Sequence, residues 1–180
     1  GQRCRRQHVR FRHRQQRLRA AGAEPAGERQ FEDNRLYDDQ AGSVRATGRM
    51  LRLRIVGGRQ LLTFKEAPTA EQSESAYKQR EELETDVSDI EVLHAVLLRL
   101  GYSVRWRYQK WRESCRWGDL HVELDETPIG NFLELEGEPA AIDRAAERLG
   151  FTRSDYIAAS YRDLQERVAG AGAGDLVFRS

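Results

Sequence analysis

The sequence has few of the features that mark a specialised protein class. Its two cysteines, Cys4 and Cys115, stand in neither a metal-binding nor a disulfide-framework spacing, so we interpret both as free thiols. No apolar run approaches the roughly 20 residues of a membrane span. No segment has the basic, apolar and small-residue order of a signal peptide. These absences predict a cytoplasmic protein that has no membrane partner.

Acidic residues are missing from the beginning of the chain. Residues 1–20 contain eight arginines and no acid. The remainder of the chain therefore contains 22 of the 30 basic residues and all 29 acidic ones. The net charge of +1 therefore hides a basic first segment and an acidic body. Such a segment is typical of an arm that binds nucleic acid or an acidic surface, of a solvated terminus, or of a misread gene start.

Apolar and charged residues alternate along most of the body, and this period of two predicts β-strands. The clearest pair covers 50–56 and 59–65, joined by Gly57 and Gly58, because glycines supply the positive φ angles of a two-residue hairpin turn. A strand that ends in a turn is expected in 27–39. Further strands, each with one apolar and one charged face, are expected in 78–87, 102–117, 121–125 and 130–136, and a helix is the alternative for 78–87.

Helices are predicted between and after these strands. The first is capped by Ser88, with Glu91 completing a capping box, and it ends at Gly101. Its buried stripe is expected to be Leu93, Val96, Leu97 and Leu100. A second helix is predicted over 139–149, and a third begins after a cap at Ser154.

The charged strand faces admit two explanations. In one, a single sheet packs helices on its apolar side and leaves the charged side in water. In the other, the sheet closes so that the charged faces line a polar lumen. Such a lumen has a chemical use, because arginine and lysine bind phosphate oxygens, while carboxylates bind Mg²⁺ or Mn²⁺.

Six short motifs occur in order: LRLR at 51–54, LTFK at 62–65, R-x-E-x-E at 80–84, K-x-R at 110–112, ELD at 123–125 and G-x-F-x-E-x-E at 130–136. In order and spacing they resemble the CYTH superfamily, the triphosphate tunnel metalloenzymes, over about residues 18–165. That group includes class IV adenylate cyclases, thiamine triphosphatases and inorganic triphosphatases. The length is closest to its cyclase-like bacterial branch.

The resemblance implies an α+β fold: a closed antiparallel β-tunnel of about eight strands, with a polar charged lumen and helices packed outside. The residues that it assigns to triphosphate binding are Arg52, Arg54, Lys65, Arg80, Lys110 and Arg112. Those that it assigns to catalysis are Lys65, Glu82, Glu84 and Asp125. It implies Mg²⁺ or Mn²⁺ as cofactor, with Asp125, Glu134 and Glu136 as metal ligands.

The chain departs from the family pattern in its first strand. That strand normally carries E-x-E-x-K, and counting back from Gly22 places it near residues 1–5, where this sequence has GQRCR. We therefore divide the chain into a basic arm or non-native start at 1–17, which replaces the first strand, a tunnel domain at 18–168 and a flexible tail at 169–180. If residues 1–17 are authentic, we expect metal-dependent turnover to be impaired and triphosphate binding to be retained.

Four functions remain open on the sequence. The leading one is an enzyme similar to class IV adenylate cyclases, which converts ATP to cyclic AMP and pyrophosphate. The alternative is a triphosphatase that acts on thiamine triphosphate or inorganic triphosphate, or an impaired tunnel that only binds polyphosphate. Expected partners are thus a nucleoside or organic triphosphate or tripolyphosphate, in a monomer or homodimer. Nucleic-acid binding through the basic arm is the least favoured function.

Overall fold

The structure is a computed structural model that describes residues 2–10, 15–70 and 78–179, with side chains described for 16–70 and 80–179. Its strands are β1 (Gln2–Arg10), β2 (Glu24–Pro25), β3 (Gln30–Asp38), β4 (Met50–Val56), β5 (Arg59–Lys65), β6 (Lys78–Asp86), β7 (Ser103–Trp117), β8 (Leu120–Thr127) and β9 (Gly130–Glu136). Its helices are α1 (Gln15–Ala20), α2 (Ser43–Ala46), α4 (Ile90–Arg99), α5 (Pro139–Arg148), the 3-10 helix η1 (Arg153–Asp155) and α6 (Tyr161–Ala169).

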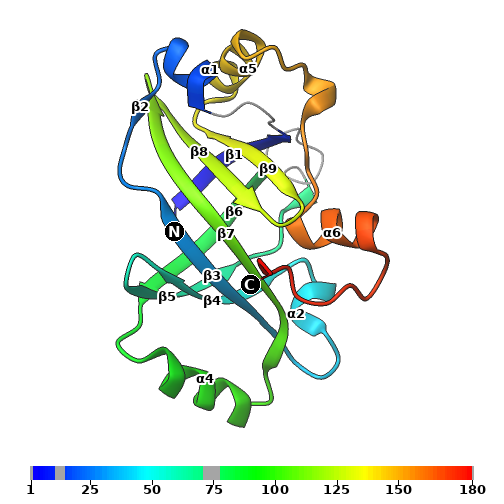
Figure 1. Ribbon diagram of the computed structural model, residues 1–180. Coiled ribbons are helices and arrows are strands. Elements are labelled where there is room, and N and C mark those ends of the chain that lie inside the picture. The colour runs from blue at the N-terminus through cyan, green and yellow to red at the C-terminus, as the bar shows by residue number, and fades with distance from the viewer. Residues whose placement is uncertain (1, 11–14, 71–77, 180) are drawn as a thin grey trace.

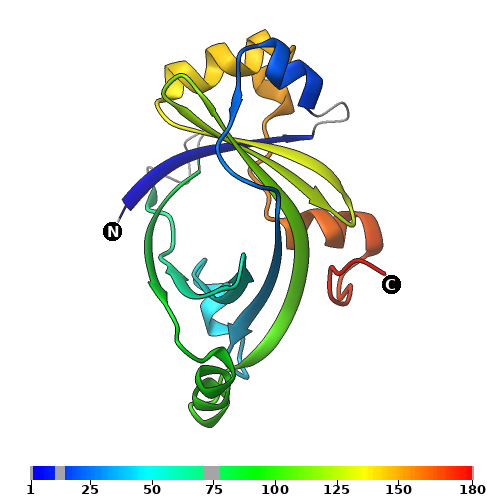
Figure 2. The same ribbon diagram turned by 60° about the vertical axis from the view of Figure 1, so that its left-hand side comes forward.

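The strands form one curled antiparallel sheet in an α+β fold (Figure 1). The order is β2-β7-β3-β4-β5-β6-β1-β9-β8, and β7 also pairs with β8. The curl is plainest in Figure 2, where the strands bend around a common axis. In that view α1 and α5 lie at the top of the curl and α4 lies at the bottom. The predicted α+β class and the antiparallel strands are confirmed.

The glycine hairpin is confirmed in detail. Gly57 and Gly58 have φ angles of 54° and 78°, and the strands that they join pair so that Leu53 lies opposite Leu62. β6 is also a strand, as its alternation predicts. Successive side chains of a strand point to opposite faces of the sheet, so Arg52 and Arg54 lie on one face and Leu53 lies on the other.

The main apolar core lies on one face of β8 and β9. Val122 and Leu133 are fully buried there, and Leu18 of α1 and Ile142 and Ala146 of α5 pack against them. The acids of β8 and β9 alternate with these apolar residues and therefore lie on the other face. The helices α1 and α5 thus cover the apolar side and leave the charged side clear.

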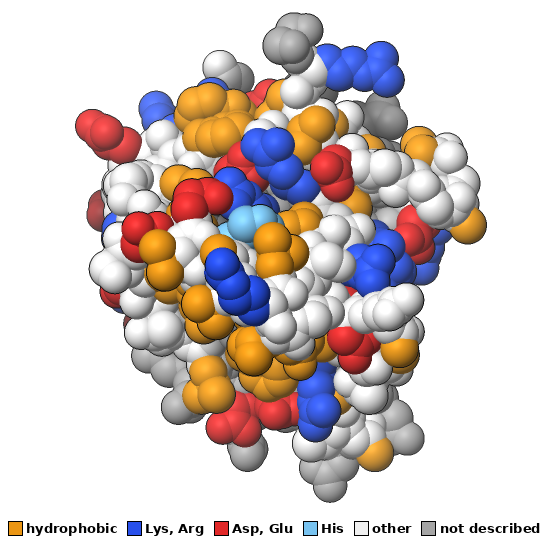
Figure 3. Space-filling view, turned by 90° about the horizontal axis from the view of Figure 1, so that it is seen from below, with side chains coloured by type: hydrophobic (Ala, Val, Ile, Leu, Met, Phe, Trp, Pro, Cys, Tyr) orange, Lys and Arg blue, Asp and Glu red, His pale blue; other side chains and the backbone are white. Residues whose placement is uncertain are grey.

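Helix α4 differs from the prediction at its beginning and along its face. Its N-cap is Asp89 rather than Ser88, and the Asp89 carboxylate accepts hydrogen bonds from the amides of Glu91 and Val92. Only Ile90 and Leu97 are buried, because the helix contacts the rest of the molecule along a narrow stripe. The predicted stripe is wrong at Val96 and Leu100, which are exposed. Hydrophobic side chains accordingly gather on the face seen from below (Figure 3).

Two segments near the ends of the chain also differ from expectation. Residues 2–10 form strand β1 between β6 and β9, where the sequence shows no clean strand period. The third helix does not begin at Ser154, because residues 153–155 form only a 3-10 turn. Helix α6 begins at Tyr161 after a capping box made by Ser160 and Asp163. The division of the chain at residue 17 stays a prediction.

The last residues are not a loose tail throughout. Leu176 is buried against Trp106 and Tyr108, and its backbone exchanges hydrogen bonds with Arg107 and Gln109 of β7. One apolar side chain among the glycines is enough to anchor the segment, because β7 has an open edge at this position. No helix in the described part of the chain is long and apolar enough to cross a membrane.

Candidate functional site

One cavity of about 430 Å³ collects all six cations to which the family resemblance gives a role in triphosphate binding. They come from four strands: Arg52 and Arg54 from β4, Lys65 from β5, Arg80 from β6, and Lys110 and Arg112 from β7. Two predicted acids, Glu82 and Glu134, also line it, whereas Glu84, Asp125 and Glu136 are not among its lining residues. We call the sheet face that carries Arg52, Lys110 and Glu134 the charged face.

The charged face changes character along β3 and β7. Three pairs of residues lie opposite each other on these strands: Leu36 with Trp106, Asn34 with Tyr108, and Glu32 with Lys110. Residues that are directly opposite share a face, so the surface passes from apolar through neutral polar to charged. Met50 of β4 also lines the cavity, opposite Lys65 of β5. The cavity therefore offers an apolar end and an ionic end.

Arg52 lies buried in the middle of this surface. Its guanidinium donates hydrogen bonds to two neutral hydroxyls, those of Tyr108 at 3.3 Å and Thr63 at 3.1 Å. The carboxylates of Glu82 and Glu84 lie only at the limit of ion pairing, at 3.9 and 3.8 Å. The Arg52 Nε has no hydrogen-bond partner among the described residues. Burial and the nearby charge of Arg54 lower the pKa of Arg52.

The other cations on this side are held by short polar contacts. Arg54 donates to the Asn34 amide oxygen at 2.8 Å, and Lys65 pairs with Glu82 at 2.8 Å. Arg80 donates to the Gly48 carbonyl at 3.1 Å. Of the two predicted catalytic glutamates on β6, Glu82 thus faces the cavity through Lys65, while Glu84 accepts a hydrogen bond from Thr63 at 2.8 Å.

Arg112 is enclosed by carboxylates. Its Nε and Nη2 bind the two oxygens of Asp125 at 2.6 and 2.7 Å, Nη2 also binds Glu134 at 2.8 Å, and Nη1 contacts Glu123. Asp125 is fully buried and accepts a further hydrogen bond from Lys110 at 2.9 Å. Burial would raise the pKa of Asp125, but Arg112 and Lys110 outweigh it and hold that pKa well below its usual range. The ionic end is therefore a network of paired charges.

Glu32 completes this network from β3. Its carboxylate lies 3.4 Å from both Arg54 and Lys110 and 3.7 Å from Arg112. Burial would raise its pKa, yet the charges of Lys110, Arg112 and Arg54 lower it to about 2. Sequence patterning did not single out Glu32, because its role depends on the pairing of β3 with β7, which alternation within one strand does not reveal.

Helix α6 borders the cavity through Tyr161. The Tyr161 hydroxyl donates to the Asp125 carboxylate at 2.6 Å. Burial and the negative charge of Asp125 raise the Tyr161 pKa well above its ordinary value, so the hydroxyl keeps its proton. One turn further, the Gln165 amide oxygen accepts a hydrogen bond from the Trp106 indole at 3.0 Å. The two contacts fix the helix beside both ends of the cavity.

Four more arginines line the cavity, and sequence patterning missed all of them: Arg45, Arg49, Arg105 and Arg162. Arg45 binds Asp163 and Glu166 of α6, and Arg49 binds Glu66. They stand on or beside α2, on α6 and near the start of β7, so no single alternation connects them. Their only signal is the general excess of arginine.

Mg²⁺ or Mn²⁺ requires a group of oxygen ligands that is not already neutralised by cations of the protein. Asp125 and Glu134 both bind Arg112, and the β1–β9 register places Arg6 opposite Glu136 and His8 opposite Glu134. Among side chains of residues 16–70 and 80–179, no three His, Cys, Asp or Glu residues are grouped to hold an ion. The donor set does not fit a divalent metal as it stands, and metal binding stays a prediction.

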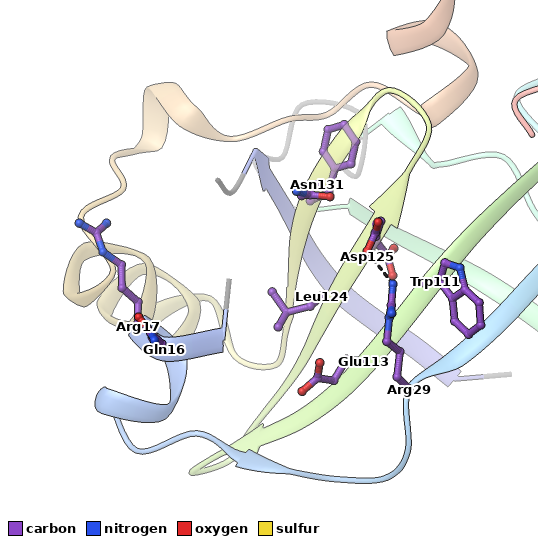
Figure 4. Close-up of a pocket in the computed structure, with 10 residues that line it drawn as sticks. Gln16, Arg17, Arg29, Trp111, Glu113, Leu124, Asp125 and Asn131 are labelled. Carbon is purple, nitrogen blue, oxygen red and sulfur yellow. Dashed lines mark hydrogen bonds and ion pairs between the residues drawn. The ribbon is translucent and has the colours of Figure 1, made fainter. Parts of the chain in front are cut away.

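A second hollow, of about 680 Å³, lies beside α1, β7, β8 and β9 (Figure 4). Arg29 crosses it, with its guanidinium 4.6 Å from the centre of the Trp111 ring and 2.6 Å from Glu126. Asp125 is the one predicted site residue among those that line it. The hollow therefore does not compete with the first cavity as the place where the predicted residues meet.

Comparison with known proteins adds a family to this geometry. A family model described as CYTH domain matches residues 7–161. A proposed adenylate cyclase of Methanocaldococcus jannaschii is 25% identical over 148 residues, which cover 76% of this chain and 82% of that protein.

Solved structures show the same fold. A proposed adenylate cyclase of Vibrio parahaemolyticus superposes with a TM-score of 0.75 at 20% identity, covering 92% of this chain and 99% of that one. A proposed adenylyl cyclase of Hippeastrum, described as having a dominant triphosphatase activity, superposes with a TM-score of 0.66 at 16% identity, covering 93% and 96%.

Proposed function

Because this chain belongs to the CYTH domain family, we propose that its curled sheet encloses a polar tunnel that binds a triphosphate. The phosphates lie against Arg52, Arg54, Lys65 and Arg80. Ten lysines and arginines line the cavity, so a ligand with several negative charges matches it. Lys110 and Arg112 keep their carboxylate partners and shape the ionic end.

The buried Arg52 carries this proposal. A guanidinium out of water costs free energy unless a charged partner compensates it, and here its close partners are neutral hydroxyls. Its Nε, which has no partner in the described part of the chain, and its lowered pKa both indicate a cation whose acceptor is a ligand. A phosphate oxygen supplies that acceptor, because guanidinium groups bind phosphate through parallel hydrogen bonds.

The apolar end of the cavity favours an organic triphosphate over tripolyphosphate. On the charged face Leu36 lies opposite Arg52, and Trp106 lies opposite Leu36. Met50 lies opposite Lys65 and lines the same cavity, so a base or other ring bound beside these cations would pack against apolar side chains. Binding sites commonly combine apolar walls with a few placed charges. ATP and thiamine triphosphate both have this form.

The proposed reaction is cleavage of that triphosphate. The names of the Methanocaldococcus and Vibrio relatives favour cyclisation of ATP to cyclic AMP and pyrophosphate. The description of the Hippeastrum relative favours hydrolysis to a diphosphate and phosphate. Of the four predicted catalytic groups, Lys65 and Glu82 line the cavity and remain the proposed ones. A cytoplasmic location stays a prediction.

Product analysis tests the proposal. The purified protein is incubated with ATP, thiamine triphosphate and tripolyphosphate, each with Mg²⁺, with Mn²⁺ and with EDTA. Cyclic AMP identifies the cyclase, and phosphate release identifies the hydrolase. Tight triphosphate binding without any product leaves only the binding function. If neither binding nor product is found with any ligand, the proposal fails.

A further inference from the structure

The carboxylates that would serve a metal are already organised around a cation of the chain itself. Each of the three guanidinium nitrogens of Arg112 contacts a carboxylate, from Asp125, Glu134 or Glu123. Glu32 lies 3.7 Å from the same guanidinium. A guanidinium is protonated at any ordinary pH, so these carboxylates already surround a permanent cation.

The strand register extends this arrangement to β1. Across β1, β9 and β8, His8, Glu134 and Glu123 form one row, and Arg6, Glu136 and His121 form the next. A magnesium-type site takes oxygen ligands, chiefly carboxylates. At the two β1 positions opposite Glu134 and Glu136, however, the sequence has the basic residues His8 and Arg6.

The charge of the cluster is close to balance. Four acids, Glu32, Glu123, Asp125 and Glu134, face the three cations Arg54, Lys110 and Arg112. A divalent ion placed among these acids would lie within a few ångströms of two or three positive groups, and like charges at that distance repel strongly in a buried site. The carboxylates thus already have the counter-charge that a metal would bring.

We propose that Arg112 is a built-in cation at the acid cluster, and that this chain binds its triphosphate without a divalent metal. The inference rests on the proposed function for the identity of the ligand. The claim that Arg112 takes the place of a metal at the acid cluster is independent of the ligand, because metal binding can be measured with no triphosphate present.

Two measurements on the whole protein test the inference. The first titrates Mn²⁺ and follows the electron paramagnetic resonance signal of the free ion. We expect no loss of signal at millimolar Mn²⁺, whereas stoichiometric binding would overturn the inference. The second measures ATP binding by calorimetry in EDTA and in Mg²⁺. We expect dissociation constants within twofold, and a tenfold or greater weakening in EDTA would contradict metal-free binding. If ATP binds in neither buffer, the proposed function fails while the Mn²⁺ result still decides the role of Arg112.

A matched pair of variants sharpens the Mn²⁺ measurement. Arg112→Ala removes the cation from the acids, so the folded variant should gain Mn²⁺ binding. Arg107→Ala removes an arginine from the opposite face of the same strand, where Arg107 pairs with Asp33. Like the native protein, this variant should bind no Mn²⁺. A folded Arg112→Ala that binds no more Mn²⁺ than Arg107→Ala would refute the assignment. If Arg112→Ala does not fold, Arg112→Gln serves the same comparison, and the native protein alone keeps the test decisive.

Discussion

Arg112 on β7 lies directly opposite Asp125 on β8, and its guanidinium binds both oxygens of that carboxylate, at 2.6 and 2.7 Å. The carboxylate is fully buried and also accepts hydrogen bonds from Lys110 and Tyr161. Buried charges of this kind stabilise a fold only as a complete set, because the desolvation of each ion must be offset by its partners. The pair therefore joins β7, β8 and α6 at the ionic end of the cavity.

Asp125→Asn should destabilise the protein severely. The variant leaves Arg112 and Lys110 with less compensating charge in a buried place, and the loss of one partner from such a set costs about 3–5 kcal/mol of the free energy of unfolding. Urea unfolding at neutral pH measures it. Asp86→Asn is the control, because its pair with Arg59 is well exposed and should contribute no more than about 1 kcal/mol. Equal losses in the two variants would contradict the role of the buried set.

Arg52→Met should separate ligand binding from stability. A charged hydrogen bond to a phosphate contributes about 1.5–3 kcal/mol, so ATP affinity should fall about tenfold to a hundredfold. The free energy of unfolding should stay equal or rise, since a buried, weakly compensated charge is removed. Calorimetry and urea unfolding measure the two effects. Arg107→Met, which loses a cation from the other face of the sheet, should leave ATP affinity unchanged.

Much of this site could be predicted from the sequence because strand alternation is a local property. Arg52, Arg54, Lys110 and Arg112 fall in phase on two strands, and the structure places all four in one cavity. The hairpin at Gly57 and Gly58 was equally local. What alternation could not supply was the pairing of β3 with both β4 and β7, which brings Glu32 to Lys110.

Tertiary context explains the remaining differences. Val96 and Leu100 fit a helical stripe, but α4 contacts the sheet mainly through Ile90 and Leu97 and leaves them exposed. The partners of Arg112 also depended on spatial neighbours. An arginine in a phosphate-binding motif suggests a ligand contact, whereas three strands bring carboxylates to this one. Residue type could not reveal that competition.

Met50→Ser should distinguish organic from inorganic ligands. Met50 is an apolar side chain that lines the cavity, so the change removes contact area for a base or ring and leaves the phosphate-binding cations in place. Loss of one such apolar contact corresponds to about 1–3 kcal/mol, or roughly tenfold to two-hundredfold in affinity. Calorimetry should therefore show weaker binding of ATP and unchanged binding of tripolyphosphate. Equal weakening of both ligands would refute the apolar subsite.

Tyr161→Phe should weaken the attachment of α6 to the cavity. The Tyr161 hydroxyl donates to Asp125, and a hydrogen bond to a charged group contributes about 1.5–3 kcal/mol to the free energy of unfolding. Tyr156→Phe is a matched control, because that hydroxyl donates to Asp143 at 2.7 Å on α5. Both variants should lose stability in urea, but only Tyr161→Phe should change ATP affinity. A change of affinity in Tyr156→Phe alone would contradict the placement of the site.

Glu32 predicts how stability depends on pH. Its folded-state pKa is about 2, below the ordinary 4.5, so the unfolded chain binds its proton at a higher pH than the native protein does. The stabilisation by Glu32 is therefore fully present above about pH 5, declines as the pH falls from 4.5 towards 2, and is lost below both values. A shift of this size corresponds to about 3 kcal/mol. Urea unfolding of the native protein and Glu32→Gln at a series of pH values between 7 and 3 should show their stabilities converging as the pH falls. A difference that stays constant over that range would mean that the charge of Glu32 contributes nothing to folding, because the stabilisation must disappear when the carboxylate is protonated.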